Sequence, residues 1–198
     1  MKPFNGVLAQ LARALDLQFR CQGFESPRLH FFKLIDMKII FLDIDGVMVP
    51  DYQKVNDQAF PKDNDWDAKP FSQKGMITLN NAILSTDARV VISSDWRKHY
   101  SLQVMRDIFV AAGILYGEDT IIGYTKIIGY GDYKSNRAQE ILEWVSLHRP
   151  DQWVAIDDLD LSPYLSEDNF VHCKYPIEGI KQLGKRAEIE IKLGRIKQ

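Results

Sequence analysis

Short apolar runs alternate with longer amphipathic stretches along most of the chain. Apolar runs of a few residues that end at polar residues or glycine are typical of buried strands, whereas apolar residues spaced three and four apart indicate helices. Strands are expected at Ile39–Leu42, Arg89–Ser94, Gln152–Ile156 and Phe170–Cys173. Helices are expected at Gly75–Asp87, Ser101–Ala112 (with Ser101 as the N-cap), Ser135–His148 and Ile177–Ile196.

This alternation predicts an α/β fold, a mainly parallel sheet with helices on both faces in a three-layer sandwich. Gly117–Tyr133 contains four glycines and two short β-like pieces, at Ile121-Ile122 and Ile127-Ile128, and predicts loops joined by a hairpin or an edge strand. The polar connection Pro50–Ser72 is too short for a domain of its own and is expected to be a small flap or functional loop. No large cap domain is therefore expected.

Two aspartates follow the first strand directly. The segment Lys38–Val49 reads KIIFLDIDGVMV, so Asp43 and Asp45 are two positions apart and leave an extended chain on the same side. Neighbouring carboxylates repel each other unless a cation or a shared proton relieves the repulsion. A chemical role is therefore favoured over the alternative, an acidic strand end that only caps a turn.

Polar side chains also end two other predicted strands, Ser93 and Ser94 in one case and Asp157 and Asp158 in the other. Ligands of parallel sheets bind at the carboxyl ends of the strands, so the three groups are expected to converge. Carboxylates bind a hard cation such as Mg²⁺, which offsets the repulsion between an anionic nucleophile and a phosphate. With an aspartate as nucleophile, such a site suits phosphoryl transfer through a covalent aspartyl-phosphate.

These motifs resemble those of a known superfamily. FLDIDGV is similar to motif I of the haloacid dehalogenase (HAD) superfamily, VVISS to motif II and VAIDD to motif IV, and the resemblance extends from Met37 to the C-terminus. ISSDWR, followed by RAQEILEW and AIDD, resembles more closely the HAD phosphatase domains of Swiss Army Knife RNA repair proteins. The resemblance implies a HAD-like Rossmannoid fold without a large cap.

The resemblance also implies roles for five residues. Asp43 is expected to be the nucleophile and a metal ligand, and Asp45 the general acid and base, with its carbonyl on the metal. Ser93 is expected to hydrogen-bond the transferring phosphoryl group. Asp158 is expected to bind Mg²⁺ directly, with Asp157 contributing as an orienting or water-mediated metal ligand.

The cationic residue of motif III has two candidates. Arg137 opens the helix before the third strand, and Lys134 lies three residues earlier. Arg137 is favoured because its guanidinium fork suits an oxyanion. The alternatives are a surface salt bridge of Arg137 with Glu140 or Glu143 and a solvated loop charge for Lys134.

Further residues near these motifs are expected to contact the substrate. Arg97 follows motif II and is placed to reach a phosphodiester or a second phosphate, although a helix-entry charge is the alternative. Trp96 has two interpretations, stacking on a base and packing in the core. Ser94 and Gly46 complete the expected substrate-binding set.

The function expected from these features is that of a Mg²⁺-dependent phosphatase, a phosphoric monoester hydrolase. A site without a large cap admits nucleic-acid termini or another large phosphorylated substrate, whereas small metabolites are usually enclosed. One alternative is a nucleotide or sugar-phosphate phosphatase with Pro50–Ser72 as its lid. The other is a non-catalytic regulator that binds metal and phosphate. A monomer is the default expectation.

Composition bears on the class of ligand and on the cellular location of the protein. The 198 residues carry a formal net charge of −2, so the chain has no overall basic character of the kind found in nucleic-acid-binding proteins. No apolar run is long enough to span a membrane. The two cysteines, Cys21 and Cys173, have neither C-x-x-C nor zinc-binding spacing, and a reducing, cytoplasmic location is expected.

The first 36 residues differ in character from the rest. The string AQLARALDLQFRCQGFESPRLH resembles the conceptual translation of a transfer-RNA gene, with Phe24-Glu25-Ser26 corresponding to the T-arm. A second methionine, Met37, directly precedes the first strand. We therefore expect residues 1–36 to be a poorly ordered, non-native extension from a misassigned start, and residues 37–198 to form the phosphatase domain. A genuine N-terminal helix or a targeting peptide is the alternative.

Overall fold

A computed structural model of the chain describes residues 36–50, 71–129 and 132–194. The expected N-terminal extension (1–36) and flap (50–72) lie, except for residues at their edges, outside the described ranges, and both stay predictions. Within these ranges no cap domain is inserted, and no helix has the length and apolar character needed to cross a membrane.

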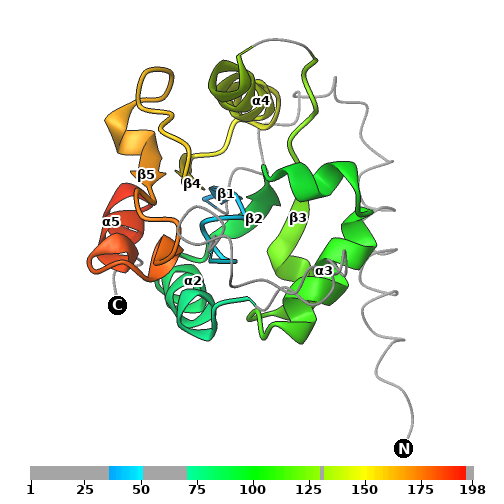
Figure 1. Cartoon of the computed structure of the whole chain (residues 1–198), viewed down its shortest axis with the longest axis vertical. Coiled ribbons are helices and arrows are strands. Elements are labelled where there is room, and N and C mark those ends of the chain that lie inside the picture. The colour runs from blue at the N-terminus through cyan, green and yellow to red at the C-terminus, as the bar shows by residue number, and fades with distance from the viewer. Residues whose placement is uncertain (1–35, 51–70, 130–131, 195–198) are drawn as a thin grey trace, which may run out of the picture. The chain divides into compact units, whose positions relative to one another are not determined.

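The described residues form one five-stranded sheet in which every neighbouring pair of strands is parallel (Figure 1). The strand order is β3-β2-β1-β4-β5, so the strand that precedes the two aspartates lies at the centre. This arrangement confirms the predicted α/β class. The strands are β1 (Lys38–Leu42), β2 (Arg89–Ile92), β3 (Ile121–Tyr124), β4 (Gln152–Asp157) and β5 (Phe170–His172).

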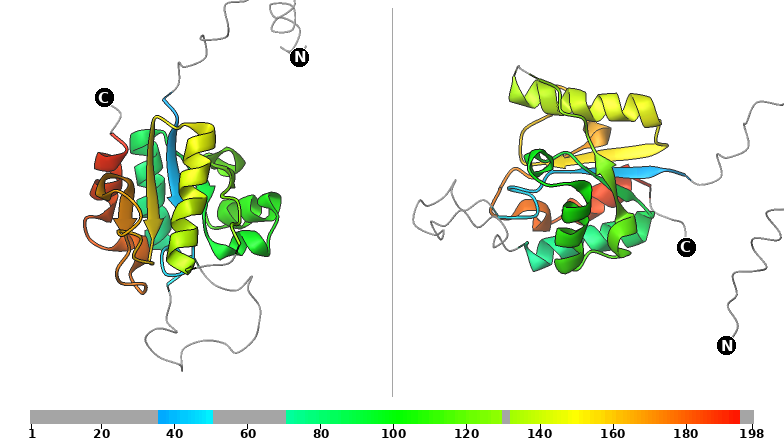
Figure 2. Two further views of the ribbon diagram at one scale, coloured as in Figure 1. Left: turned by 90° about the horizontal axis from the view of Figure 1, so that it is seen from above. Right: turned by 90° about the vertical axis from the view of Figure 1, so that its right-hand side faces the viewer.

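Helices cover both faces of this sheet. In Figure 2, α4 is the α-helix on one side of the sheet, and the other α-helices lie on the opposite side. The two hydrophobic clusters agree, because one joins the sheet to α4 and the other joins it to α2, α3 and α5. The helices are α2 (Gln73–Thr86), α3 (Leu102–Ala111), α4 (Tyr133–His148) and α5 (Lys185–Lys192).

The central strand is apolar throughout because both of its faces are covered. Side chains alternate between the faces of a strand, so Ile39 and Phe41 point toward α4 and Ile40 and Leu42 toward the other helices. All four side chains are fully buried. The sequence pattern of a continuous apolar run, without polar alternation, is thereby explained.

Polar side chains define where the helices begin. Ser101 accepts a hydrogen bond from the backbone N–H of Val104, which confirms it as the N-cap of α3. Asp132 caps α4 in the same way, by accepting from the N–H of Ser135 at 2.8 Å. Each cap satisfies a backbone donor that has no partner within its helix. The start of α4 is important because this helix carries the motif III candidates.

The expected terminal helix over Ile177–Ile196 is wrong in extent. A short 3₁₀ turn, η6 (Gly179–Lys181), comes first, and α5 begins only after Gly184, whose φ is +88°. A Cβ on Gly179 would lie 2.1 Å from the carbonyl oxygen of Val47, and the N–H of Ile180 donates to that same oxygen. The chain therefore bends here to pack against the turn that carries Asp45.

Of the two structures predicted within Gly117–Tyr133, a hairpin or an edge strand, the edge strand is confirmed. Ile121–Tyr124 forms β3, an edge strand that pairs in parallel with β2. A hairpin would need an antiparallel partner, and Ile127-Ile128 is not a strand. The edge position agrees with the presence of glycine in β3, since an edge strand requires packing on fewer sides.

Candidate functional site

The three polar strand ends meet at one edge of the sheet. The N–H of Asp43 donates to the carbonyl of Ile156, and the N–H of Ser93 donates to the carbonyl of Leu42, each at 3.0 Å. Asp43 therefore lies between Ser93 on one side and the end of β4, which carries Asp157, on the other. This is the convergence expected from the sequence.

The side chains at these strand ends face the α4 layer. Phe41, Val91 and Ala155 belong to the cluster that packs against α4. Asp43, Ser93 and Asp157 each lie two residues further along the same strands and so continue on the same side. A residue at the N-terminal end of α4 is consequently well placed to reach them.

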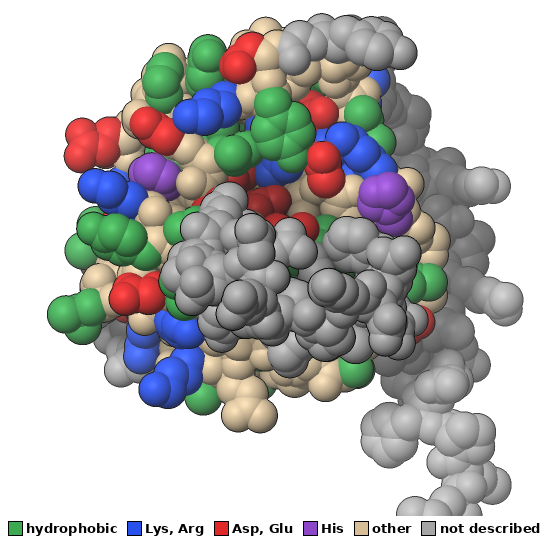
Figure 3. All heavy atoms as spheres, viewed as in Figure 1, with side chains coloured by type: hydrophobic (Ala, Val, Ile, Leu, Met, Phe, Trp, Pro, Cys, Tyr) green, Lys and Arg blue, Asp and Glu red, His purple; other side chains and the backbone are tan. Residues whose placement is uncertain are grey.

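Three carboxylates form a close group at this edge. Asp43, Asp157 and Asp158 each offer an oxygen, and these oxygens all lie within 4.8 Å of one another. Asp43 and Asp157 are 5% and 1% exposed, and Asp158 is half-buried. Carboxylate oxygens at this spacing are the donors that Mg²⁺ takes in proteins, so the residues present fit a magnesium ion. Figure 3 shows acidic side chains recessed near the middle of this face, with basic side chains beside them.

Arg137 joins two of these carboxylates. Its Nη1 lies 2.9 Å from Oδ1 of Asp43 and 2.8 Å from Oδ2 of Asp157, and its side chain is buried. The guanidinium thus faces motifs I and IV together, and it does not pair with Glu140 or Glu143 on the helix surface. Lys134, in the first turn of the same helix, is exposed. Of the two motif III candidates, the structure places Arg137 against the carboxylates.

Burial dominates the electrostatics of the group. Burial raises the pKa of Asp43, against the opposing charge of Arg137, and the nearby charge of Asp158 raises it further. Burial, and then the charge of Asp43, hold the pKa of Asp157 well above its usual range. Burial opposes the charge of Arg137, but Asp43 and Asp157 outweigh it and keep its pKa above the ordinary value. One guanidinium among three close carboxylates leaves an excess of negative charge that favours a bound cation.

Asp45 lies in the turn after β1, close to motif II. Its Oδ2 accepts a hydrogen bond of 2.8 Å from the indole N–H of Trp96. The next residue, Gly46, has a φ of +77°, and a Cβ there would lie 2.5 Å from Oδ2 of Asp158. Glycine is therefore required both by the backbone and by the close approach of Asp158. This spacing role is the one that the structure shows for Gly46.

The two serines of motif II have different surroundings. The hydroxyl of Ser93 is buried and has no hydrogen-bond partner within the described residues. The hydroxyl of Ser94 instead caps the 3₁₀ turn η3 (Asp95–Lys98), where it accepts from the N–H of Trp96. A buried hydroxyl without a partner is costly, so of the two serines Ser93 is the one whose hydroxyl could still take a hydrogen-bond partner.

Arg97 does not extend into the substrate space. Its guanidinium, 1% exposed, donates to the carbonyls of Ser93 and Ser94 and pairs with Glu140 of α4. Burial lowers the pKa of Arg97, and the charge of Glu140 opposes this effect. The expectation of a phosphate contact was based on proximity in the sequence, but the guanidinium binds the motif II loop to α4. We therefore interpret Arg97 as a residue that positions Ser93.

Tyr133 and Asp95 lie beside Arg137 but are not among the site residues predicted from the sequence. The hydroxyl of Tyr133 accepts from Nη2 of Arg137 at 2.9 Å, and its ring lies over the guanidinium. The residue as a whole is 47% exposed. Burial raises the pKa of Tyr133 to about 12. Burial also opposes the charge of Asp95, but hydrogen bonds from Lys98 and Tyr133 outweigh it and lower the pKa of that carboxyl. The sequence feature that could have predicted the contact between Tyr133 and Arg137 is their spacing of one helical turn.

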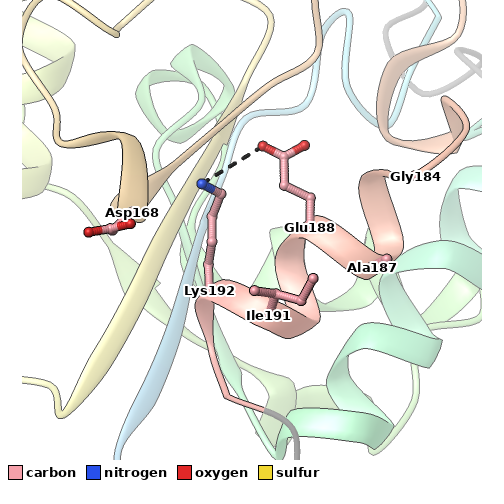
Figure 4. Close-up of a pocket in the computed structure, with 6 residues that line it drawn as sticks. All are labelled: Asp168, Gly184, Ala187, Glu188, Ile191 and Lys192. Atoms are coloured by element: carbon pink, nitrogen blue, oxygen red, sulfur yellow. Dashed lines mark ion pairs between the residues drawn. The ribbon is translucent and has the colours of Figure 1, made fainter.

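A second hollow lies away from this edge, between η5 (Glu167–Asn169) and α5 (Figure 4). It contains one ion pair, between Glu188 and Lys192 on the same face of α5, at 3.9 Å. None of the residues expected from the sequence to act in catalysis or binding lines it. The hollow is lined by Asp168, Gly184, Ala187, Glu188, Ile191 and Lys192.

Comparison with known proteins identifies the family. Residues 39–182 match the family described as the HAD domain in Swiss Army Knife RNA repair proteins. Neither the comparison with curated proteins nor that with solved structures found a match. The matched segment begins at the second residue of β1 and ends beyond β5, so it contains four strands completely, all of β1 but Lys38, and every residue of the acidic group. The chain therefore belongs to the family of HAD domains found in Swiss Army Knife RNA repair proteins.

Proposed function

We propose that this protein is a Mg²⁺-dependent phosphatase that works through an aspartyl-phosphate on Asp43. One observation carries the proposal: the carboxylates of Asp43 and Asp157, which are buried, and of Asp158, which is half-buried, stand beside Arg137 at the carboxyl edge of a HAD-family sheet. The unpartnered hydroxyl of Ser93 at the same edge supports it.

The carboxylates of Asp43, Asp157 and Asp158 would hold the metal. When bound, Mg²⁺ supplies positive charge that offsets the repulsion between the phosphate and the carboxylates. Arg137 provides a fixed positive charge beside Asp43, and Ser93 provides a hydrogen-bond donor for a phosphoryl oxygen. Both groups stabilise charge that develops in the transition state, and the burial of Arg137 and Ser93 strengthens these interactions.

The reaction proceeds in two displacements. A carboxylate oxygen of Asp43 attacks phosphorus, the bond to the leaving oxygen breaks, and Asp45 gives its proton to that oxygen. Asp45, now a carboxylate, takes a proton from water, whose oxygen attacks the phosphorus of the aspartyl-phosphate. Inorganic phosphate leaves, Asp43 is restored, and Asp45 again carries the proton.

We infer that the substrate is a phosphorylated end of a nucleic acid, with RNA favoured by the family description. The absence of a cap among the described residues supports a large substrate, and the exposed ring of Tyr133 next to Arg137 offers a surface for a base. A nucleotide or sugar-phosphate phosphatase is the second candidate. The third, a non-catalytic regulator, is disfavoured because Asp43 and Asp45 are both present.

The test is phosphate release from 4-nitrophenyl phosphate, with and without Mg²⁺, for the wild type and Asp43→Asn. We expect turnover that requires Mg²⁺ and falls to background in the variant, because the amide is not a nucleophile. Equal activity of the two proteins would exclude Asp43 as nucleophile. Competition between a 3′-phosphorylated oligoribonucleotide and a 3′-mononucleotide then distinguishes the first substrate class from the second.

A further inference from the structure

Trp96 connects motif II to the acid/base residue of motif I. Its indole N–H donates to Oδ2 of Asp45 at 2.8 Å, across 51 positions of sequence. Asp45 lies in the turn after β1, and Trp96 lies in η3, directly after motif II. The bond therefore spans two separate loops at the carboxyl edge of the sheet.

Trp96 is itself held firmly. The residue is 5% exposed, and its ring lies edge-on to Phe71, with 6.1 Å between the ring centroids. Tyr100 packs on it at 5.7 Å, and Ser94 accepts from its backbone N–H. This burial leaves no ring face open for stacking on a base. The core-packing interpretation therefore holds, and the N–H is the only polar group that the side chain presents.

Asp45 has an equally restricted backbone. The turn that contains it is closed by a hydrogen bond of 2.8 Å from the N–H of Gly46 to the carbonyl of Val49. Asp45 also forms a β-bridge with Val49. With the turn and the indole both fixed, the bond between them restricts the orientation of the carboxylate.

We propose that Trp96 is a positioning residue for Asp45, a role that rests on the proposed function. An indole N–H can only donate, so Oδ2 of Asp45 is held as the acceptor of this bond. The indole is neutral, so it orients the carboxyl group without adding charge to the site. Removal of the N–H lets the carboxyl group rotate away from the leaving oxygen.

The expected consequence depends on the leaving group. A 4-nitrophenolate leaves without needing a full proton, whereas the sugar oxygen of a 3′-phosphorylated oligoribonucleotide requires one. Trp96→Phe keeps a buried ring and removes the N–H. We expect it to lower kcat/KM about 10-fold or more for the oligoribonucleotide and less than about 3-fold for 4-nitrophenyl phosphate.

Phe71→Leu is the matched control, because it loosens the packing of the Trp96 ring and leaves the N–H in place. Its effect, whatever the size, should be the same for both substrates. A Trp96→Phe variant that loses the same factor on both substrates, or loses nothing, would overturn the proposal. A difference confined to the oligoribonucleotide would support it.

A spectroscopic measurement tests the contact without turnover. The sequence has four tryptophans, so the indole N–H resonance of Trp96 is identified in a ¹H–¹⁵N spectrum as the one missing from Trp96→Phe. Asp45→Asn should move that resonance upfield, because an amide accepts more weakly than a carboxylate. A Trp96 resonance that does not move would overturn the positioning role. If Trp96→Phe does not fold, an Asp45→Asn spectrum in which none of the indole resonances moves overturns it equally.

Different results would contradict the proposed function and the positioning role of Trp96. If the wild type releases phosphate from neither substrate with Mg²⁺, the proposed function is wrong, and the positioning role falls with it although the resonance still moves. If the wild type is active and Trp96→Phe has the same ratio of kcat/KM for the two substrates as the wild type, only the positioning role is wrong.

Discussion

Gly46 lies directly against the carboxylate of Asp158: a Cβ added to Gly46 would be 2.5 Å from Oδ2 of that side chain. The contact joins motif I to motif IV at the point where the metal is expected. It also makes Gly46 a position at which one methyl group would displace a proposed metal ligand without changing any charge.

We predict that Gly46→Ala weakens Mg²⁺ activation by about 10-fold or more, because moving a metal ligand or its orienting contact typically costs 10–100-fold in affinity. The measurement is the Mg²⁺ concentration for half-maximal phosphate release. Gly113→Ala is the control, since Gly113 has a φ of +90° but nothing within 4 Å of the added Cβ. A Gly113→Ala variant with the same loss of Mg²⁺ affinity would attribute the effect to backbone strain.

The buried pair of Arg97 and Glu140 should stabilise the fold measurably. Glu140→Ala leaves the buried Arg97 guanidinium with only the longer ion pair to Asp95, at 3.6 Å, and we expect a loss of about 3–5 kcal/mol in the free energy of unfolding. Glu143→Ala, on the same helix, removes an exposed pair with Lys126 at 3.6 Å and should cost about 0–1 kcal/mol. Urea denaturation compares the two, and equal losses would contradict a special role for the buried pair.

The two serines of motif II should separate stability from activity. Ser93→Ala removes a buried hydroxyl that has no partner in the described structure, so stability should not fall, whereas kcat/KM should fall about 10–100-fold. Ser94→Ala removes a cap and should cost about 0.5–1 kcal/mol in the free energy of unfolding. Thermal melts and phosphatase assays of both variants check this. A Ser93→Ala variant with full activity would remove Ser93 from the site.

Arg137 and Lys134 should differ strongly on substitution. Arg137→Ala removes the charge between Asp43 and Asp157, and we expect kcat/KM to fall about 100-fold or more. Lys134→Ala changes an exposed residue of the first turn of α4 and should cost less than about 3-fold. Steady-state kinetics at saturating Mg²⁺ compare them. The reverse order would make Lys134 the motif III residue.

Cys173 should be unreactive in the folded protein. Burial raises the pKa of its thiol, so the nucleophilic thiolate is scarce at pH 8, and the fully buried side chain excludes the reagent. In a Cys21→Ser variant, a disulfide reagent should label Cys173 at least about 100-fold more slowly than in urea. Rapid labelling without denaturant would show that the β5 end opens readily.

The strands, most helix positions and the three polar strand ends could be predicted because their signals are local. A buried central strand must be apolar on both faces, as Ile39–Leu42 is, and polar residues appear as soon as the strand ends at Asp43. Ser101 was recognisable as a cap for the same reason. The predicted terminal helix was too long because the chain at Gly179 packs closely against the carbonyl of Val47, which is far away in the sequence.

The sequence by itself determined which groups stand at the carboxyl edge, since strand periodicity and strand ends depend on neighbouring residues alone. Only the tertiary structure decided what those groups touch. Arg97 pairs with Glu140 across 43 positions, and Trp96 binds Asp45 across 51. The packing of the backbone decides which groups lie within reach of a long polar side chain. Burial then favours pairing among them, because an unpaired buried donor or charge is costly. No local pattern reveals which partner will be within reach.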